Sequence, residues 1–153
     1  MSFEADVKFV SNEKGTAIYP NPIFSNADTV SVVFVYEAFP KRGLFFVGWD
    51  DKTNTAPKQI WTQGQGIDNR YWVPHVDDQN DKLITSISAT VDADYAVISN
   101  GKLLDKSSLS GKVKWRFAMK EPHSSYLMML AIGKYESFNE YGNGVELQHY
   151  FYP

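Results

Sequence analysis

Alternation between apolar and polar residues dominates the chain. In residues 112–119 every second side chain is apolar, and the side chains between them include Lys114 and Arg116. On a strand the two sets face opposite sides, so this run predicts that Trp115 and Phe117 lie in a core while the basic residues face water. Residues 83–91 and 145–151 repeat the pattern. The alternation therefore predicts half-buried β-strands.

Two further runs are apolar on both faces, namely residues 30–36 and 126–132. Continuous apolar runs of this length are typical of central strands that are covered on both sides. Shorter strand-like runs occupy residues 43–49, 58–63 and 95–99. No window carries an apolar stripe with helical period, so the pattern predicts an all-β chain.

Turn residues separate these runs. Asn100-Gly101 lies between two of them and predicts a type I′ hairpin, because both central residues of that turn need positive φ. Ser110-Gly111 and Asn143-Gly144 predict further turns. With 153 residues and no internal linker, we expect residues 1–153 to form a single antiparallel β domain.

Composition agrees with strands and excludes several functions. Aromatic residues make up 15% of the chain, and their rings pack well on a pleated surface. The net charge of −3 disfavours a nucleic-acid partner, and the absence of cysteine excludes disulfides and thiol chemistry. No apolar stretch has the length of a membrane-spanning helix.

We find no catalytic apparatus and expect no metal or cofactor site in this chain. The histidines His75, His123 and His149 are far apart, and none has a partner at metal-ligand spacing. The acidic residues 77–81 lack the glycine and the distal glutamate of a calcium loop. Without other information, a free-standing carbohydrate-binding β-sandwich that stacks tryptophans on sugars is one interpretation of such a domain.

Four stretches give a more specific indication. Residues 61–66 read Trp-Thr-Gln-Gly-Gln-Gly, and residues 70–74, Arg-Tyr-Trp-Val-Pro, follow them, with Asp77 beyond. Before them, residues 43–46 read Gly-Leu-Phe-Phe. After them come Val-Ile-Ser-Asn-Gly at residues 97–101 and Pro-His-Ser-Ser-Tyr-Leu at residues 122–127.

In this order and at this spacing, the stretches resemble the aminopeptidase N family of zinc metallopeptidases. The resemblance covers roughly residues 30–153. It implies the saddle-like β-sandwich N-terminal domain of such an enzyme, which a thermolysin-like zinc domain follows in the family. The zinc-domain motifs Gly-x-Met-Glu-Asn and His-Glu-x-x-His do not occur here. We therefore expect a fragment truncated at both ends that leaves an exposed apolar or open-edged face.

The resemblance also implies a function for the parent protein, an aminopeptidase that needs zinc. This chain alone is expected to be non-catalytic. Its expected partners are its own downstream zinc domain and peptides with a free N-terminus. Two alternatives stay open: a relative that has lost catalysis and kept binding or scaffolding, and the carbohydrate-binding sandwich.

The candidate substrate-binding residues are Gln65 and Gln63. On an extended strand they would share a face, with only Gly64 between them. A glutamine offers an acceptor for a substrate α-ammonium, although the family segment often has Glu at the position of Gln65. The alternative is that both glutamines only satisfy backbone groups at a sheet edge.

One further departure from the family pattern and one further expectation concern the loop after this strand. Gln79 stands where the family pattern has proline, which removes a source of rigidity from that turn. Arg70 and Asp77 are expected to be structural partners that hold the loop.

Overall fold

The structure is a computed structural model that describes residues 6–12, 15–21, 25 and 29–153. It divides into two compact units, residues 1–35 and residues 36–153, which we describe separately. In the first unit β1 (Asp6–Asn12) pairs antiparallel with β2 (Gly15–Asn21). The single domain expected over residues 1–153 stays a prediction. No helix in the described part of the chain could cross a membrane.

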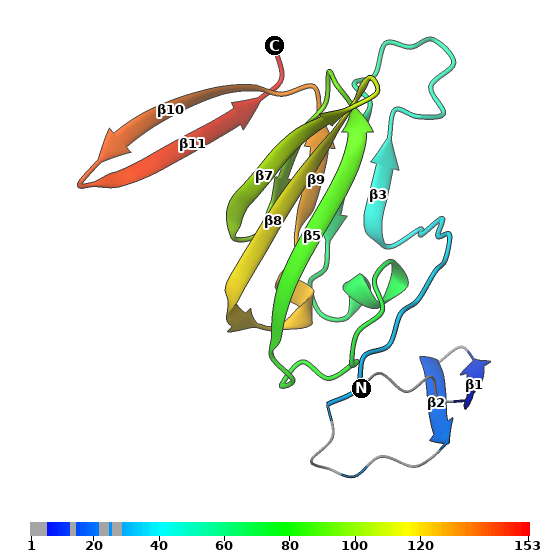
Figure 1. Ribbon diagram of the computed structural model, residues 1–153. Helices are drawn as coiled ribbons and strands as arrows, with labels where there is room; N and C mark the ends of the chain where they lie inside the picture. The colour runs from blue at the N-terminus through cyan, green and yellow to red at the C-terminus, as the bar shows by residue number, and fades with distance from the viewer. Residues whose placement is uncertain (1–5, 13–14, 22–24, 26–28) are drawn as a thin grey trace. The chain divides into compact units, whose positions relative to one another are not determined.

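The second unit contains two sheets that pack face to face (Figure 1). The first has the order β3-β4-β9-β6 and the second the order β5-β8-β7. The strands of the first sheet are β3 (Gly43–Val47), β4 (Gln59–Gln63), β9 (Leu130–Gly133) and β6 (Ala96–Ser99). Those of the second are β5 (Leu83–Asp92), β8 (Lys112–His123) and β7 (Lys102–Leu109). The pairings in both sheets are antiparallel, which confirms the predicted fold class.

Two 3-10 helices and a hairpin complete this unit. The helices are η1 (Asp68–Tyr71) and η2 (Ser125–Leu127). Strands β10 (Glu136–Gly142) and β11 (Val145–Phe151) pair only with each other among the described strands, and Figure 1 shows their hairpin extending away from the two sheets.

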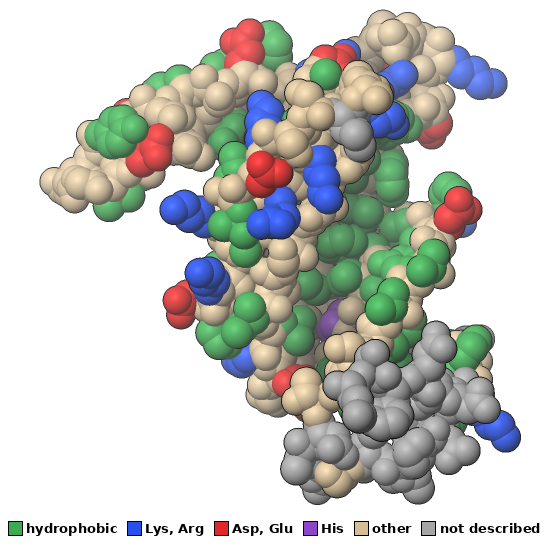
Figure 2. Space-filling model, viewed as in Figure 1, with side chains coloured by type: hydrophobic (Ala, Val, Ile, Leu, Met, Phe, Trp, Pro, Cys, Tyr) green, Lys and Arg blue, Asp and Glu red, His purple; other side chains and the backbone are tan. Residues whose placement is uncertain are grey.

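The core lies between the two sheets. Val97, Phe117, Leu130 and Ile132 form its buried centre, with contributions from β6, β8 and β9. Strand β8 alternates as predicted: Val113 and Phe117 are buried, and the lysines and arginine between the apolar residues are exposed. Figure 2 shows Lys and Arg side chains over the three-stranded sheet.

Trp115 is only half-buried, although it packs against this core. Its ring packs parallel to that of Phe117 at 6.5 Å between centroids. The ammonium of Lys106 lies 4.0 Å from the centroid of the Trp115 ring. A cation over the face of an aromatic ring is attracted by the ring quadrupole, so Lys106 covers the part of the indole that the core leaves open.

Two predicted turns are confirmed and one is wrong. Ser110-Gly111 and Asn143-Gly144 have positive φ at both residues and connect paired strands, as type I′ hairpins require. At Asn100-Gly101 only the glycine has positive φ, and the flanking strands β6 and β7 belong to different sheets. The Asn100 side chain instead binds the backbone of the η2–β9 connection.

The two predicted central strands also differ from the structure. Residues 30–36 form no strand, and their side chains are largely exposed, Val33 to 85% and Val35 to 96%. An apolar pattern records the character of the side chains, but a strand also needs a neighbour for its backbone hydrogen bonds. Of residues 126–132, only the part from Leu130 onward is a strand, because η2 turns the chain before it.

Candidate functional site

The two segments at residues 61–66 and 122–127 that resemble aminopeptidase N meet at an open hollow of about 350 Å³. Its lining comes from the end of β4 and from the η2–β9 connection. The lining residues are Thr62, Gln63, Gly64, Gln65, Tyr126, Leu127, Met128 and Met129. None of these side chains carries a charge, so the hollow offers amides, a hydroxyl, a phenol, two thioethers and an aliphatic side chain.

The hollow exists because β4 and β9 separate. Their regular pairing ends at Trp61 opposite Ala131, although β4 continues to Gln63. One residue further on, the Thr62 hydroxyl accepts the hydrogen bond of the Leu130 N–H at 3.0 Å. Here a side-chain hydroxyl accepts the hydrogen bond that a backbone carbonyl would accept in a regular pair of strands. The two backbones therefore diverge and leave room between them.

Gln63 and Gln65 both line this hollow, but they do not share one extended strand as predicted. Strand β4 ends at Gln63, and Gln65 lies in the turn that leads into η1. Gly66 has φ of +79°, a left-handed conformation that glycine adopts without strain and that reverses the chain here. The sequence pattern did not indicate this reversal, because it favoured an extended strand through Gln63 and Gln65.

Both glutamines are available for a ligand. Each is exposed, and neither side chain makes a hydrogen bond within the described ranges. The alternative that they satisfy backbone groups at a sheet edge therefore finds no support in these contacts. Gln65 is exposed and its amide oxygen is unbonded among the described residues, as an acceptor for a substrate must be. Its role in binding stays a prediction.

Gln79 holds the turn at Gly66 where the family pattern has proline. Its side-chain amide donates a 2.6 Å hydrogen bond to the Gly66 carbonyl, and its backbone carbonyl accepts one of 3.1 Å from the Ser124 hydroxyl. Lys82 also donates to the Ser124 hydroxyl, at 2.6 Å. A proline could accept the bond from Ser124 through its own backbone carbonyl but could not donate to Gly66, so in this chain the Gln79 side chain holds the turn at Gly66 in place of the proline ring.

Asn69 is the residue that sequence reasoning missed. It is 1% exposed and lies on η1 behind the hollow. Its amide nitrogen donates to the carbonyls of Ser125, at 2.7 Å, and Met128, at 3.0 Å. Its amide oxygen accepts from the Trp72 indole at 2.8 Å. One side chain thus joins η1 to residues 125–129, which we call the η2 wall. In the sequence, only the position of Asn69 after the Gln-Gly-Gln-Gly run could have drawn attention to it.

The opposite side of the η2 wall is fixed by β6 and the residue after it. The Asn100 amide donates to the Leu127 carbonyl at 3.1 Å, and its oxygen accepts from the Met129 N–H. The Ser99 hydroxyl donates to the Met129 carbonyl at 2.7 Å. Polar side chains from Asn69, Ser99 and Asn100 therefore satisfy backbone groups of residues 125–129 that no β-strand or longer helix satisfies, as a partly buried irregular segment requires.

Gly64 is required by the packing of Asn69. A Cβ at Gly64 would lie 2.4–2.6 Å from three side-chain atoms of Asn69, closer than any real contact. Gly64 therefore permits the close approach of a side chain of the protein itself.

We expect Gly64→Ala to lower the free energy of unfolding by about 1–3 kcal/mol, the usual cost of overpacking a site that cannot relax. Chemical denaturation of the 153-residue chain measures it. Gly142→Ala is the matched control, because a Cβ there meets no atom within 4 Å and φ is not positive. Equal stability of the two variants would contradict the account of the Gly64–Asn69 contact.

Ion pairs hold the loop beyond η1. Arg70 and Asp77 pair at 2.7 Å, which confirms them as structural partners. Arg42 pairs with Asp68 at 2.8 Å and lies over the Tyr71 ring at 5.1 Å. In residues 6–12, 15–21, 25 and 29–153, no three His, Asp or Glu side chains gather as metal ligands. The described residues therefore offer no set of donors that fits a zinc ion.

Comparison with known proteins identifies the family and the fold. Residues 2–127 match the family model described as the peptidase M1 N-terminal domain. A two-domain M1 zinc metallopeptidase solved with L-arginine superposes with a TM-score of 0.64 at 14% identity, over 93% of this chain and 34% of that one. An M1 zinc metallopeptidase from Deinococcus radiodurans, solved with a Tyr-Ser-Ala substrate, gives 0.52 at 16% identity, over 59% and 22%.

Curated proteins that are similar in sequence are described differently from these metallopeptidases. They are transcription initiation factor TFIID subunit 2 of Danio rerio and of Gallus gallus, each 26% identical over 125 residues. The match covers 76% of this chain in both cases, but the chain spans only 10% and 11% of the length of these relatives.

Proposed function

The chain belongs to the family of peptidase M1 N-terminal domains, and we propose on that premise that it forms one wall of the substrate cleft in a larger zinc-dependent aminopeptidase. In that protein the wall recognises the free N-terminus of a peptide. The zinc ion and the groups that carry out hydrolysis belong to another domain, which is a partner of this chain.

The exposed, unbonded amide of Gln65 is the observation that carries the proposal. A peptide α-ammonium has only donors, so it needs an acceptor, and the Gln65 carbonyl oxygen supplies one. Gln63 lines the same hollow and is a second candidate acceptor. The tight packing of Asn69 and Gly64 behind Gln65 supports the proposal, because a recognising group needs a fixed base.

The second candidate function is a relative that retains binding or scaffolding without catalysis. Gln65 favours it, since a neutral amide attracts an ammonium less strongly than the carboxylate common at this position in the family. The curated relatives, which are described as subunits of a transcription initiation factor, point the same way.

A carbohydrate-binding sandwich has the least support. It needs free coplanar aromatic faces, but Trp61 stacks on Phe45 at 4.9 Å and Trp49 stacks on Tyr95 at 6.1 Å.

An activity assay separates the two main candidates. We expect the longer protein to hold one zinc per chain and to hydrolyse aminoacyl substrates, and the isolated 153-residue chain to do neither. Elemental analysis and a fluorogenic aminoacyl substrate measure both properties. If the longer protein is folded and zinc-loaded but inactive, the binding or scaffolding function replaces the aminopeptidase function. Tightly bound zinc in the isolated chain would contradict the division of roles.

A further inference from the structure

Strand β5 has an outer edge that no described strand pairs with. The order β5-β8-β7 places it at the margin of the three-stranded sheet, and it is ten residues long, from Leu83 to Asp92. A strand at an edge presents unpaired N–H and C=O groups that can pair with another chain.

The other edges of the two sheets are short or charged. Strands β3 and β6 have five and four residues. Strand β7 carries Lys102, Asp105 and Lys106, and a charged edge resists pairing. Residues 83–91 on β5 contain no charge and no proline. The irregularity near Leu83 does not interrupt this edge, because two steps along β5 face four along β8, so the extra residues belong to β8.

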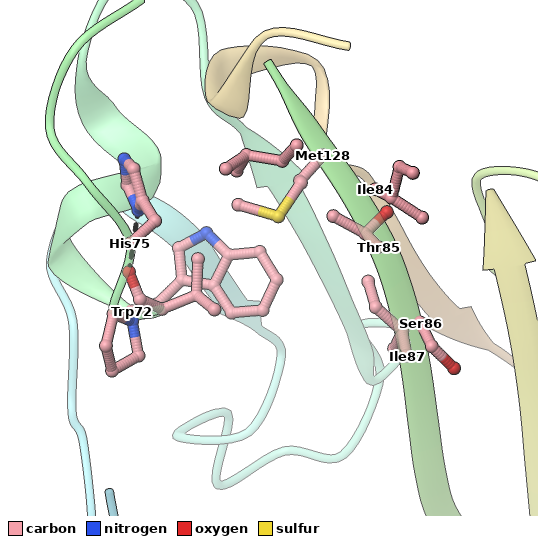
Figure 3. Close-up of a pocket in the computed structure, with 10 residues that line it drawn as sticks. Trp72, His75, Ile84, Thr85, Ser86, Ile87 and Met128 are labelled. Carbon is pink, nitrogen blue, oxygen red and sulfur yellow. Dashed lines mark hydrogen bonds between the residues drawn. The ribbon is translucent and has the colours of Figure 1, made fainter. Parts of the chain in front are cut away.

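The core is also open beside this strand. A hollow of about 320 Å³ lies between residues 83–87 of β5 and residues 72–75, with Met128 at one end (Figure 3). Leu83, Thr85 and Ile87, which alternate along the core-facing side of β5, are only half-buried. An added strand would thus gain backbone hydrogen bonds and would cover apolar side chains at the same time.

We propose that the β5 edge is a docking surface for a second copy of this chain, with the two β5 strands antiparallel about a twofold axis at Ile87. This proposal does not depend on the peptidase assignment. The strand suits a second copy of itself because its ends carry opposite charges, Lys82 before it and Asp92 at its end. Both are exposed. The Lys82 ammonium already donates to the Ser124 hydroxyl. The Asp92 carboxylate lies 3.7 Å from the Lys112 ammonium. Each group nevertheless has further donor or acceptor positions for a second partner.

The proposed register matches the side chains as well as the charges. With Ile87 opposite Ile87 of the second copy, Lys82 faces Asp92 of that copy and Leu83 faces Val91. Opposite residues in an antiparallel pair lie on the same face, so core-facing residues meet core-facing residues. A slip of one residue would place the core-facing side chains against the solvent face. The two three-stranded sheets become one continuous sheet.

Sedimentation velocity of the 153-residue chain between about 1 and 300 µM tests the proposal. An edge pairing of this size belongs with small interfaces, so we expect a dissociation constant of about 10–100 µM. Lys82→Glu and Asp92→Lys each place like charges opposite one another twice per dimer, and each is expected to weaken the dimer about tenfold or more. The double variant restores both opposite-charge pairs and is expected to return to within about threefold of the original.

Lys102→Glu is the control, since it reverses an exposed charge at the other edge of the same sheet. We expect it to leave the dimer unchanged. A chain that stays monomeric to 300 µM would overturn the proposal, and so would a double variant as weak as the single ones. Loss of the dimer on Val33→Asp, with the Lys82 and Asp92 variants unaffected, would identify residues 29–36 as the contact instead and would also overturn it.

Discussion

Replacing Asn69 by alanine is expected to lower the free energy of unfolding by about 3–5 kcal/mol. The substitution leaves the carbonyls of Ser125 and Met128 and the indole N–H of Trp72 without partners. A buried polar group that loses its partner costs about 1–3 kcal/mol, and Asn69 serves three. The loss of stability exceeds that of a surface substitution because Asn69 is 1% exposed. Water therefore does not readily bond the polar groups that lose their partner.

Denaturant unfolding of the 153-residue chain measures this loss. Asn80→Ala is the matched control, since its side chain is exposed and makes no hydrogen bond among the described residues; we expect a change below about 0.5 kcal/mol. Asn69→Asp keeps the shape but cannot donate to the two carbonyls, so it should be about as unstable as Asn69→Ala. If Asn69→Asp were as stable as the unchanged chain, the hydrogen bonds would not be what joins η1 to the η2 wall.

Replacing Gln65 by alanine in the longer protein is expected to lower kcat/KM for aminoacyl substrates roughly 10- to 150-fold. A hydrogen bond to a charged group contributes about 1.5–3 kcal/mol, and each 1.36 kcal/mol corresponds to a tenfold change. Gln65→Glu is expected to retain or raise kcat/KM, because it places a negative charge opposite the ammonium. Steady-state kinetics on the purified protein gives both values.

Two controls accompany the Gln65 variants. Gln148→Ala changes an exposed glutamine of the β10–β11 hairpin that does not line the hollow, and we expect less than a twofold effect. The unfolding free energy of Gln65→Ala should equal that of the unchanged protein, since its side chain has no partner in the described part of the chain. A loss of stability that parallels the loss of activity would assign Gln65 a structural role.

The alternation of side chains predicted much of the sandwich. Strands β5 and β8 follow the pattern because each has one face on the core and one in water. Successive side chains of a strand point to opposite faces, so such a strand alternates between apolar and polar residues. The pattern predicted less where the backbone is irregular. Residues 126–129 are apolar and were predicted as strand, but η2 and the bonds from Asn69 and Asn100 give them another conformation.

The candidate site was predictable in part. The resemblance identified Gln63, Gln65 and the segment at Tyr126, and the structure brings these residues to one hollow. It could not identify Asn69, whose role depends on contacts with residues more than fifty positions away. Nor could it locate the turn at Gly66, since a glycine next to a strand fits both an extended and a left-handed conformation.

Recognition of the substrate amine by Gln65 is tested most directly with two zinc-binding inhibitors that differ only in an α-amino group. Their dissociation constants are measured on the longer protein, with and without Gln65→Ala. We expect the substitution to weaken binding of the amine-bearing inhibitor roughly 10- to 150-fold and binding of the other less than about twofold. Equal weakening of both inhibitors, or no binding of the amine-bearing one to the unchanged protein, would contradict recognition of the amine by Gln65.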